Sequence, residues 1–164
     1  MIKVSQVTKA YDRGVKPAIE NISFQVEAGQ IHGLIGPNGS GKTTLIKCMT
    51  GILKADSGDI LLDGEPVYDN PKVKKRIGYV ADNCNFFPSY KVRKMVDFFA
   101  GMYDTFDREE FDKLNQIFEI PMERKIGQLS KGQKMRTSFM LNMAMKPEVL
   151  IMDEPTSGLD AIAK

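Results

Sequence analysis

Apolar and polar residues alternate in two short stretches near the N-terminus, at residues 2–7 and 22–26. This alternation is typical of β-strands that bury one face. Residues 59–62 form another short stretch, which ends at the turn-favouring pair Asp63 and Gly64. The three stretches predict antiparallel β structure near the N-terminus, with a hairpin connection between the first two strands.

Three further runs, residues 31–35, 76–80 and 149–152, are short and mostly apolar. Runs of this kind indicate more deeply buried strands. The first is expected to be a buried strand that contains the only histidine, His32, in a structural role. The last ends in two carboxylates, Asp153 and Glu154, and ligands of open α/β sheets bind at such strand ends.

Residues 91–146 have a different pattern, with apolar side chains at helical spacing. They predict a helical insertion between two strands of the core. Its three segments are marked by Val92, Met95, Val96 and Phe99; by Phe111, Leu114, Ile117 and Phe118; and by residues 130–146, which Pro147 ends.

The most informative motif lies between the run at 31–35 and a helix-permissive stretch at 42–51. It fits G-x-x-x-x-G-K-[ST], the phosphate loop of nucleoside triphosphatases, whose backbone N–H groups approach phosphate oxygens. Lys42 is expected to reach the β- and γ-phosphates, and the Thr43 hydroxyl to hold Mg²⁺. The predicted nucleotide-binding residues of the loop are Gly36, Pro37, Asn38, Gly39, Ser40, Gly41, Lys42, Thr43 and Thr44.

A nucleotide hydrolase also needs a carboxylate for Mg²⁺ and a group that activates water. Asp153 is predicted to hold the metal and Glu154 to be the catalytic general base. A second candidate anion site lies at residues 129–133, Leu-Ser-Lys-Gly-Gln, where Ser130 is a plausible N-cap and Gly132 leaves the helix start bare. Without other context, an ordinary helix cap explains this second motif equally well.

Charge and cysteine content narrow the functional classes. The chain has 164 residues, enough for one core of ordinary size, with 23 Lys plus Arg against 21 Asp plus Glu. This near balance gives no electrostatic case for a nucleic-acid partner. Cys48 and Cys84 form no paired metal or redox motif, and Cys48 is expected to be buried by packing. No stretch resembles a membrane span or a secretory signal, so a cytoplasmic location is expected.

The phosphate loop, the pentapeptide at 129–133 and the pair Asp153 and Glu154 occur in this order, followed by Ser-Gly-Leu-Asp at 157–160. Together they closely resemble the nucleotide-binding domain of ATP-binding cassette (ABC) transporters, of the small single-cassette bacterial exporter type. The match runs from the first strand to the last residues. The pentapeptide is specific to that family, which usually has LSGGQ, so Lys131 is a mild variation.

The resemblance implies an α/β fold: a P-loop NTPase core with an N-terminal antiparallel β portion and a helical subdomain inserted before the Walker B strand, the last core strands being missing. Residues 1–90 would form the ATP-binding core and residues 91–146 the helical subdomain. Residues 147–164 would return to the core with the Walker B strand and the D-loop.

The resemblance also assigns residues. Tyr11 lies 25 residues before Gly36, where the family places an aromatic that stacks on adenine. In this family, two cassettes pair head to tail around ATP and Mg²⁺. The pentapeptide at residues 129–133, which we call the signature, would therefore contact the nucleotide bound by the partner cassette. These trans contacts would come from Ser130, Lys131, Gly132 and Gln133, and the dimer interface would include Ser157 and Asp160.

Two departures from the family pattern stand out. Asp82 occupies the position of the family's coupling-loop glutamine, and as a carboxylate it is a candidate Mg²⁺ ligand, with Asn83 or Asn85 as substitutes. Asp82→Ala is expected to slow ATP turnover more than it weakens nucleotide binding. The family's γ-phosphate histidine is not matched before the chain ends at Lys164. This resemblance therefore implies a fragment that binds nucleotide but hydrolyses it poorly.

The expected function is the ATPase subunit of an exporter, with a second cassette subunit, a transmembrane permease subunit at the inner face of the cell membrane, and no nucleic acid as partners. The apolar loop at residues 86–90 would either receive a permease helix or pack internally. A soluble cassette ATPase that acts on ribosomes or chromosomes, and a regulatory cassette with little turnover, remain alternatives.

Overall fold

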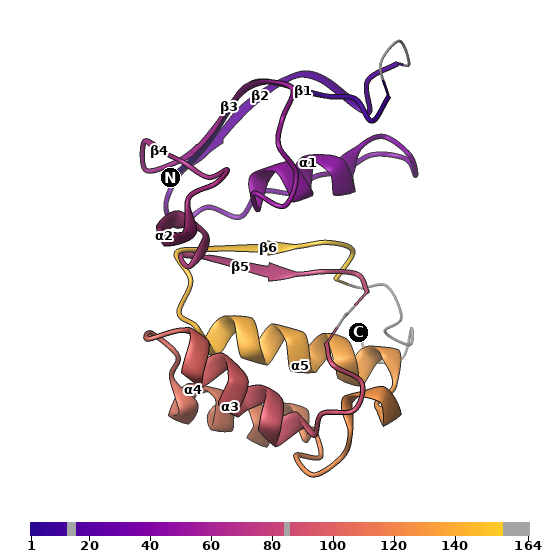
Figure 1. Ribbon diagram of the computed structural model, residues 1–164, viewed down its shortest axis with the longest axis vertical. Coiled ribbons are helices and arrows are strands. Elements are labelled where there is room, and N and C mark those ends of the chain that lie inside the picture. The colour runs from indigo at the N-terminus through magenta and orange to yellow at the C-terminus, as the bar shows by residue number, and fades with distance from the viewer. Residues whose placement is uncertain (13–15, 84–85, 156–164) are drawn as a thin grey trace. The chain divides into compact units, whose positions relative to one another are not determined.

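The computed structural model describes residues 1–12, 16–83 and 86–155 (Figure 1). The chain divides into two compact units, Met1–Lys75 and Arg76–Lys164, and each is described by itself. The expected division at residues 90 and 146 concerns functional segments and stays a prediction.

The first unit contains a four-stranded antiparallel sheet in the order β2-β1-β3-β4. Its strands are β1 (Ile2–Lys9), β2 (Ile19–Val26), β3 (Ser57–Leu62) and β4 (Glu65–Pro66). Strand β1 pairs with β2 on one side and with β3 on the other. The two strands predicted from residue alternation, the short strand at residues 59–62 and the turn at residues 63–64 are therefore confirmed.

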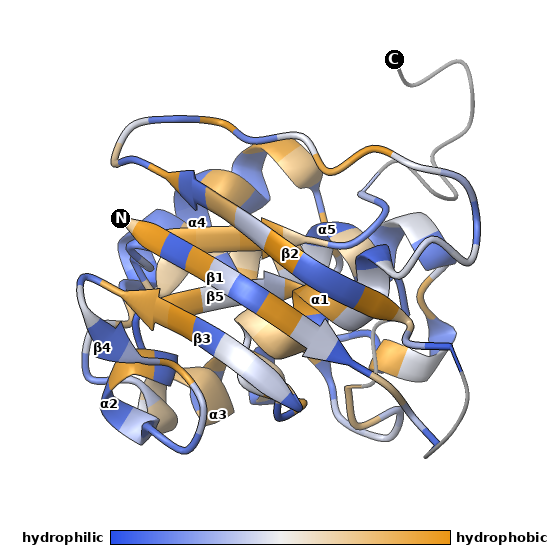
Figure 2. Cartoon of the chain, turned by 90° about the horizontal axis from the view of Figure 1, so that it is seen from above, coloured by the Kyte–Doolittle hydropathy of each residue, from blue (hydrophilic) through white to orange (hydrophobic). Residues whose placement is uncertain are grey.

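Burial along β1 follows the predicted alternation up to a bulge. Ile2 and Val4 are buried, but the next buried residue is Val7, three positions on. The pairing with β2 shifts register between Val4 and Val7, and Gln6 there has a positive φ of 50°. An extra residue in one strand has this effect, because it returns the following side chain to the core face. Figure 2 shows the alternation of hydrophobic and hydrophilic residues along β1.

Two helices complete the first unit, α1 (Lys42–Met49) and α2 (Pro71–Lys74). Helix α1 buries Leu45, Ile46, Cys48 and Met49, so the expected packing role of Cys48 is confirmed. Burial also raises the pKa of the Cys48 thiol, which keeps it protonated and unreactive. Helix α1 ends before Gly51, whose φ of 67° suits a glycine at a helix terminus.

The expected buried strand at residues 31–35 is wrong. This segment belongs to no strand, and Ile31 and Ile35 are 102% and 95% exposed. A predominantly apolar strand is stable only between neighbours that cover both of its faces and edges. In the described sheet of the first unit, residues 31–35 pair with no strand, so this run lacks the neighbours that a buried strand needs. His32 therefore lies outside a strand, where its ring stacks on Phe24 at a centroid distance of 5.1 Å.

The second unit contains a two-stranded parallel sheet and the helical insertion between its strands (Figure 1). Strand β5 (Ile77–Val80) pairs in parallel with β6 (Val149–Met152), with Ile77 opposite Val149. Parallel strands need a long crossover connection, and here it consists of α3 (Val92–Met102), α4 (Arg108–Phe118), a short 3₁₀ helix (Ile126–Gln128) and α5 (Lys131–Ala144). The predicted helical insertion is therefore confirmed.

The helices of the insertion share one hydrophobic core. Met140 of α5 belongs to this core, where a methionine can fill an irregular gap. The buried members of this core are Val92, Met95, Val96, Phe111, Ile120, Ile126, Leu129, Met140, Leu141 and Ala144.

One polar side chain ties α5 to the parallel sheet. The Asn142 Oδ1 atom accepts a hydrogen bond from the Tyr79 backbone N–H at 2.8 Å. The Asn142 Nδ2 atom donates to the Ser138 carbonyl at 2.8 Å. The buried carboxamide is thus satisfied on both sides, as buried polar groups must be.

Candidate functional site

The phosphate-loop segment of the first unit is shaped by glycines that no other residue could replace without movement. A Cβ atom on Gly41 would lie 2.2 Å from the Ala18 carbonyl oxygen, and Gly41 has a φ of 88°. A Cβ on Gly36 would lie 2.7 Å from the Ser40 Oγ atom. The loop therefore keeps its backbone close and bare, which is the property that phosphate-binding loops need.

Lys42 folds back over this loop. Its Nζ atom donates to the carbonyl oxygens of Gly36 at 2.8 Å and Pro37 at 2.9 Å. Gly41 is the N-cap of α1 and supplies no side-chain oxygen to the first turn. The ammonium group and the first N–H groups of α1 together form a donor-rich, positively polarised surface that fits a phosphate group.

Tyr11 lies beside the start of α1. Its hydroxyl is 3.0 Å from the Thr44 Oγ1 atom, and its side chain is 63% exposed. The sequence placed Tyr11 near the loop only through the family resemblance, and the hydrogen bond to Thr44 had no signal in the sequence. Because the ring is exposed and held at its hydroxyl end, one of its faces can receive a flat ligand. Stacking of Tyr11 on adenine stays a prediction.

Sequence reasoning missed the residue that holds the segment before Tyr11. The Asp56 carboxylate accepts hydrogen bonds from the Ala10 N–H and from the Lys9 Nζ atom, each at 2.7 Å. These bonds hold the pKa of Asp56 below its usual value, the Ala10 N–H contributing most. Asp56 lies 46 residues from Ala10 in the chain, so no local pattern reveals the contact.

The two predicted carboxylates of the second unit follow β6 directly and differ in burial. The Asp153 N–H donates to the Val80 carbonyl at 2.9 Å, which extends the bonding with β5, and its side chain is 4% exposed. Glu154 has a positive φ of 49° and is exposed. The change of backbone direction separates the two side chains, so one carboxylate is buried and its neighbour faces solvent.

The negative charge at this end of the sheet also acts on Tyr79. Burial raises the pKa of the Tyr79 phenol, and the charges of Asp153 and Asp82 raise this pKa further. Asp82 and Asp153 are therefore near the same ring, within one unit. The second unit thus concentrates acidic groups where β5 and β6 end.

The pentapeptide begins α5 as a reciprocal cap. The Ser130 Oγ atom accepts from the Gln133 N–H at 3.2 Å, and the Gln133 Oε1 atom accepts from the Ser130 N–H at 3.1 Å. This capping box confirms Ser130 as the predicted N-cap. The contacts of Ser130, Lys131, Gly132 and Gln133 to a partner's nucleotide stay a prediction.

The structure also pairs two residues that the sequence treated separately. The Lys131 Nζ atom lies 2.8 Å from the Asp82 Oδ1 atom, and this salt bridge joins residues 49 positions apart. Lys131 is the first residue of α5, and Asp82 follows β5 by two residues. Asp82 is one of the two departures from the family pattern, and Lys131 is the mild variation within the pentapeptide.

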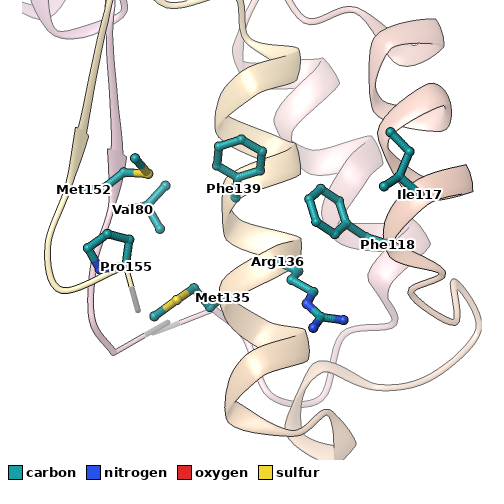
Figure 3. Close-up of a pocket in the computed structure, with 8 residues that line it drawn as sticks. All are labelled: Val80, Ile117, Phe118, Met135, Arg136, Phe139, Met152 and Pro155. Atoms are coloured by element: carbon teal, nitrogen blue, oxygen red, sulfur yellow. The ribbon is translucent and has the colours of Figure 1, made fainter. Parts of the chain in front are cut away.

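A mostly apolar cavity of about 430 Å³ lies in the second unit (Figure 3). Val80, Met152 and Pro155 line the side formed by the strands, and helices α4 and α5 supply the rest (Figure 3). The contributions of these helices are Ile117, Phe118, Met135, Arg136 and Phe139. Its lining does not suit a phosphate group, and no pattern in the sequence predicted it.

The D-loop residues Ser157 and Asp160 lie outside the described residues, as does Asn85. Within the described ranges, no group of three or more His, Cys, Asp or Glu side chains forms a metal-binding cluster. Among the same residues, no helix is long and apolar enough to cross a membrane.

Comparison with known proteins agrees with the motifs. The sequence model of the family described as "ABC transporter" matches residues 19–157. The chain is 38% identical over its whole length to the ABC transporter ATP-binding protein YtrB of Bacillus subtilis, and it covers 56% of that protein. It is 39% identical to the zinc uptake system ATP-binding protein ZurA of Listeria innocua, over 98% of this chain and 66% of ZurA.

A third relative is the SkfA peptide export ATP-binding protein SkfE of Bacillus subtilis, which is 34% identical over the whole of this chain, and the match covers 70% of SkfE. The chain thus spans between 56% and 70% of the length of these three relatives.

Solved structures give the same result. The dimeric structure of the bacterial ABC transporter cassette MJ0796 matches with a TM-score of 0.87 and 26% identity, over 99% of this chain and 78% of MJ0796. A post-hydrolysis MJ0796 dimer bound to ADP and Pi matches with a TM-score of 0.86 and 25% identity, over the same shares of the two chains. The predicted α/β cassette fold is therefore confirmed, and the chain belongs to the ABC transporter family.

Proposed function

We propose that this chain is the ATP-binding and ATP-hydrolysing part of a transporter subunit. The observation that carries the proposal is the phosphate-loop geometry of the first unit. There, the Ala18 carbonyl leaves no room for a side chain at Gly41, the Ser40 hydroxyl lies close to Gly36, and Lys42 reaches back over the loop. Family membership supplies the nucleotide, ATP.

The side chains proposed for the site are, taken one by one, of the kinds that bind Mg²⁺–ATP. Loop N–H groups and the Lys42 ammonium would bind the phosphates. The Thr43 hydroxyl and the Asp153 carboxylate are oxygen ligands of the kind that Mg²⁺ prefers, and Asp82 is a further candidate. When bound, the metal neutralises charge on the transferring phosphoryl group. The phosphate loop and these carboxylates are described within separate units.

Glu154 is proposed as the general base. It follows the buried Asp153 directly, but it is exposed. An exposed carboxylate can accept a proton from water, while its buried neighbour keeps a fixed position for a metal. Glu154 would orient and deprotonate the attacking water, and Asp153 would hold the metal.

The nucleotide would join two cassettes head to tail. The signature would present Ser130, Lys131, Gly132 and Gln133 to the γ-phosphate bound by the partner, and Ser157 and Asp160 would lie in the interface. The dimeric neighbour MJ0796 supports this arrangement. The capping box supports it too, because it already orders the start of α5.

The membrane partner would be a permease subunit, which would place the protein at the inner face of the cell membrane. The loop at residues 86–90 supports a docking role. Phe86 packs on Phe99, whereas Phe87 contacts Tyr90 and Phe98 and remains half exposed. We propose export as the direction because of the resemblance to small single-cassette exporters. SkfE is named for peptide export and ZurA for zinc uptake.

The decisive test is Glu154→Gln in the full-length protein. We expect ATP turnover to fall about 100-fold to 10,000-fold, the usual contribution of a general base. Nucleotide binding should persist, and ATP should accumulate in a trapped dimer that size-exclusion chromatography detects. Glu148→Gln, which removes a surface carboxylate paired with Arg76, is the matched control and should leave turnover unchanged. Equal turnover in Glu154→Gln and the unsubstituted protein would reject the proposed mechanism.

One observation favours a second candidate function, a regulatory cassette that binds ATP with little turnover. Asp82 replaces the family's glutamine, and its Oδ1 atom is bonded to Lys131. Negligible steady-state turnover in the unsubstituted full-length protein, with Mg²⁺–ATP binding intact, would select this alternative.

A further inference from the structure

The salt bridge between Asp82 and Lys131 joins two parts of the second unit that have different proposed tasks. Asp82 follows the end of β5, beside the strand end that carries Asp153. Lys131 opens α5, within the signature. Their charged atoms are 2.8 Å apart, and their side chains are 32% and 49% exposed. The bridge is therefore formed at the surface and is within reach of ligands.

Helix α5 alone gives no reason for a lysine at position 131. The start of a helix carries a partial positive charge, which favours anions and disfavours cations. The first turn of α5 contains no acidic residue that would offset this effect. An anion from outside the helix can offset this effect, and in the structure the Asp82 carboxylate lies in that position.

Asp82 lies in a region of negative charge. Asp82 and Asp153 both act on the Tyr79 ring, so negative charge accumulates where β5 and β6 end. Lys131 places a cation there, 2.8 Å from the Asp82 carboxylate. A glutamine at position 82 or a glycine at position 131 could not form this ion pair, so the pair exists only because this chain varies from the family pattern at both positions.

We propose that Asp82 and Lys131 exchange partners during the nucleotide cycle: they pair with each other without nucleotide, and Mg²⁺–ATP separates them. Asp82 then turns to Mg²⁺ or its water shell, and Lys131 turns to the phosphate held by the partner cassette. This inference rests on the proposed function. Lys131 is thus a positioning residue in one protomer and a phosphate ligand for the other.

The strength of the bridge suits such an exchange. Exposed ion pairs contribute little to stability, so a bound divalent cation or a triphosphate can displace one. Charge stays balanced on both sides, because the carboxylate gains a metal and the ammonium gains an anion. Mg²⁺–ATP must break the bridge when it binds to its own protomer, and this cost slightly lowers the affinity of the monomer. Lys131 is then available to the partner's phosphate, which strengthens the dimer.

The test uses Lys131→Gln, Asp82→Asn and the double variant in the full-length protein with Glu154→Gln, which prevents turnover. Equilibrium binding of Mg²⁺–ATP is measured at protein concentrations where the chain is monomeric. Lys131→Gln should raise this affinity about twofold to fivefold, the range that an exposed ion pair contributes. The increase should vanish when Asp82→Asn is present or when EDTA removes the metal.

ATP-driven dimerisation, measured by analytical ultracentrifugation, should respond in the opposite direction. Lys131→Gln should weaken the dimer at least tenfold, because it removes a charged contact to phosphate. Lys131→Arg should keep both behaviours. Lys146→Gln is the matched control: it breaks a 2.7 Å ion pair with Asp107 at the other end of α5 and should change neither measurement.

A merely structural bridge would not give opposite signs in the two assays. If Lys131→Gln leaves monomer affinity unchanged or lowers it, the exchange is wrong, even though the protein binds ATP and dimerises. If the unsubstituted protein shows no Mg²⁺-dependent affinity for ATP, the proposed function is wrong and the exchange with it.

Discussion

The phosphate loop and the acidic strand ends differ in the range of the hydrogen bonds that shape them. In the first unit, Lys42 bonds carbonyls five and six residues before it, although Gly41 also lies close to the distant Ala18 carbonyl. In the second unit, contacts join distant residues, such as Asp82 with Lys131 and Tyr79 with Asn142. A local site depends on backbone shape, whereas a long-range site depends on the fold around it. Substitutions should therefore act differently in the two regions.

The largest expected effect is on the backbone of the loop. Gly41→Ala would place a Cβ 2.2 Å from the Ala18 carbonyl oxygen at a positive φ. Strain and overpacking should together lower the free energy of unfolding by about 2–4 kcal/mol. Gly64→Ala is the matched control, because Gly64 has a similar φ of 84° but nothing within 4 Å. It should cost only about 1 kcal/mol in urea unfolding, and equal losses would show that the close approach is unimportant.

The next effect is on binding rather than folding. Lys42→Ala should weaken Mg²⁺–ATP binding about 100-fold, because hydrogen bonds from a charged donor to phosphate are lost. Isothermal titration calorimetry measures the change. Lys47→Ala, in the last turn of the same helix, should leave the affinity unchanged. Similar losses in both variants would mean that net charge alone determines the affinity.

The signature of the second unit should show a smaller effect with two components. Ser130→Ala removes the N-cap of α5 and should cost about 1 kcal/mol of stability. ATP-driven dimerisation should weaken beyond this loss if Ser130 also contacts the partner's nucleotide. Asn70→Ala removes the cap of α2, where Asn70 Oδ1 accepts from the Val73 N–H, and controls for loss of a cap alone. Equal dimerisation in the two variants would leave Ser130 as a cap only.

The smallest effect concerns acid stability of the segment before Tyr11. The folded-state pKa of Asp56 is lowered, chiefly by the Ala10 N–H and then by Lys9. Its stabilising contribution is therefore present above the unfolded pKa of about 3.9, and it is lost as pH falls through the lower folded value. In Asp56→Asn, the urea midpoint of unfolding should fall less steeply than in the unsubstituted protein as the pH is lowered into the acid range. Asp69→Asn controls for net charge, and an unchanged pH dependence in Asp56→Asn would contradict the assignment.

The sequence predicted the elements with short-range causes. Alternation gave β1 and β2, helical spacing gave α3 to α5, and the cap pattern gave Ser130. The same reasoning failed for residues 31–35, because a short apolar run does not reveal whether a sheet has a place for it. The bulge near Gln6 was also hidden, since it depends on pairing with β2 and β3.

The site residues also divide into those found from local motifs and those whose contacts join distant parts of the sequence. The phosphate loop and the pair Asp153 and Glu154 were found from local motifs. The contacts of Asp56 with Ala10, Tyr11 with Thr44, and Asp82 with Lys131 were missed, because each joins residues more than 30 positions apart. Only a folded chain brings these side chains together, so motif reasoning identifies reactive groups better than the residues that position them.

The carboxamide of Asn142 has a consequence for the fate of the chain during synthesis. A strand edge with open N–H groups is a template on which another molecule can add a strand and begin to aggregate. At Tyr79, the N–H of β5 is already bonded to a helix side chain. An incoming strand would have to displace that amide before it could pair at this point, so the helix protects the sheet against unwanted extension.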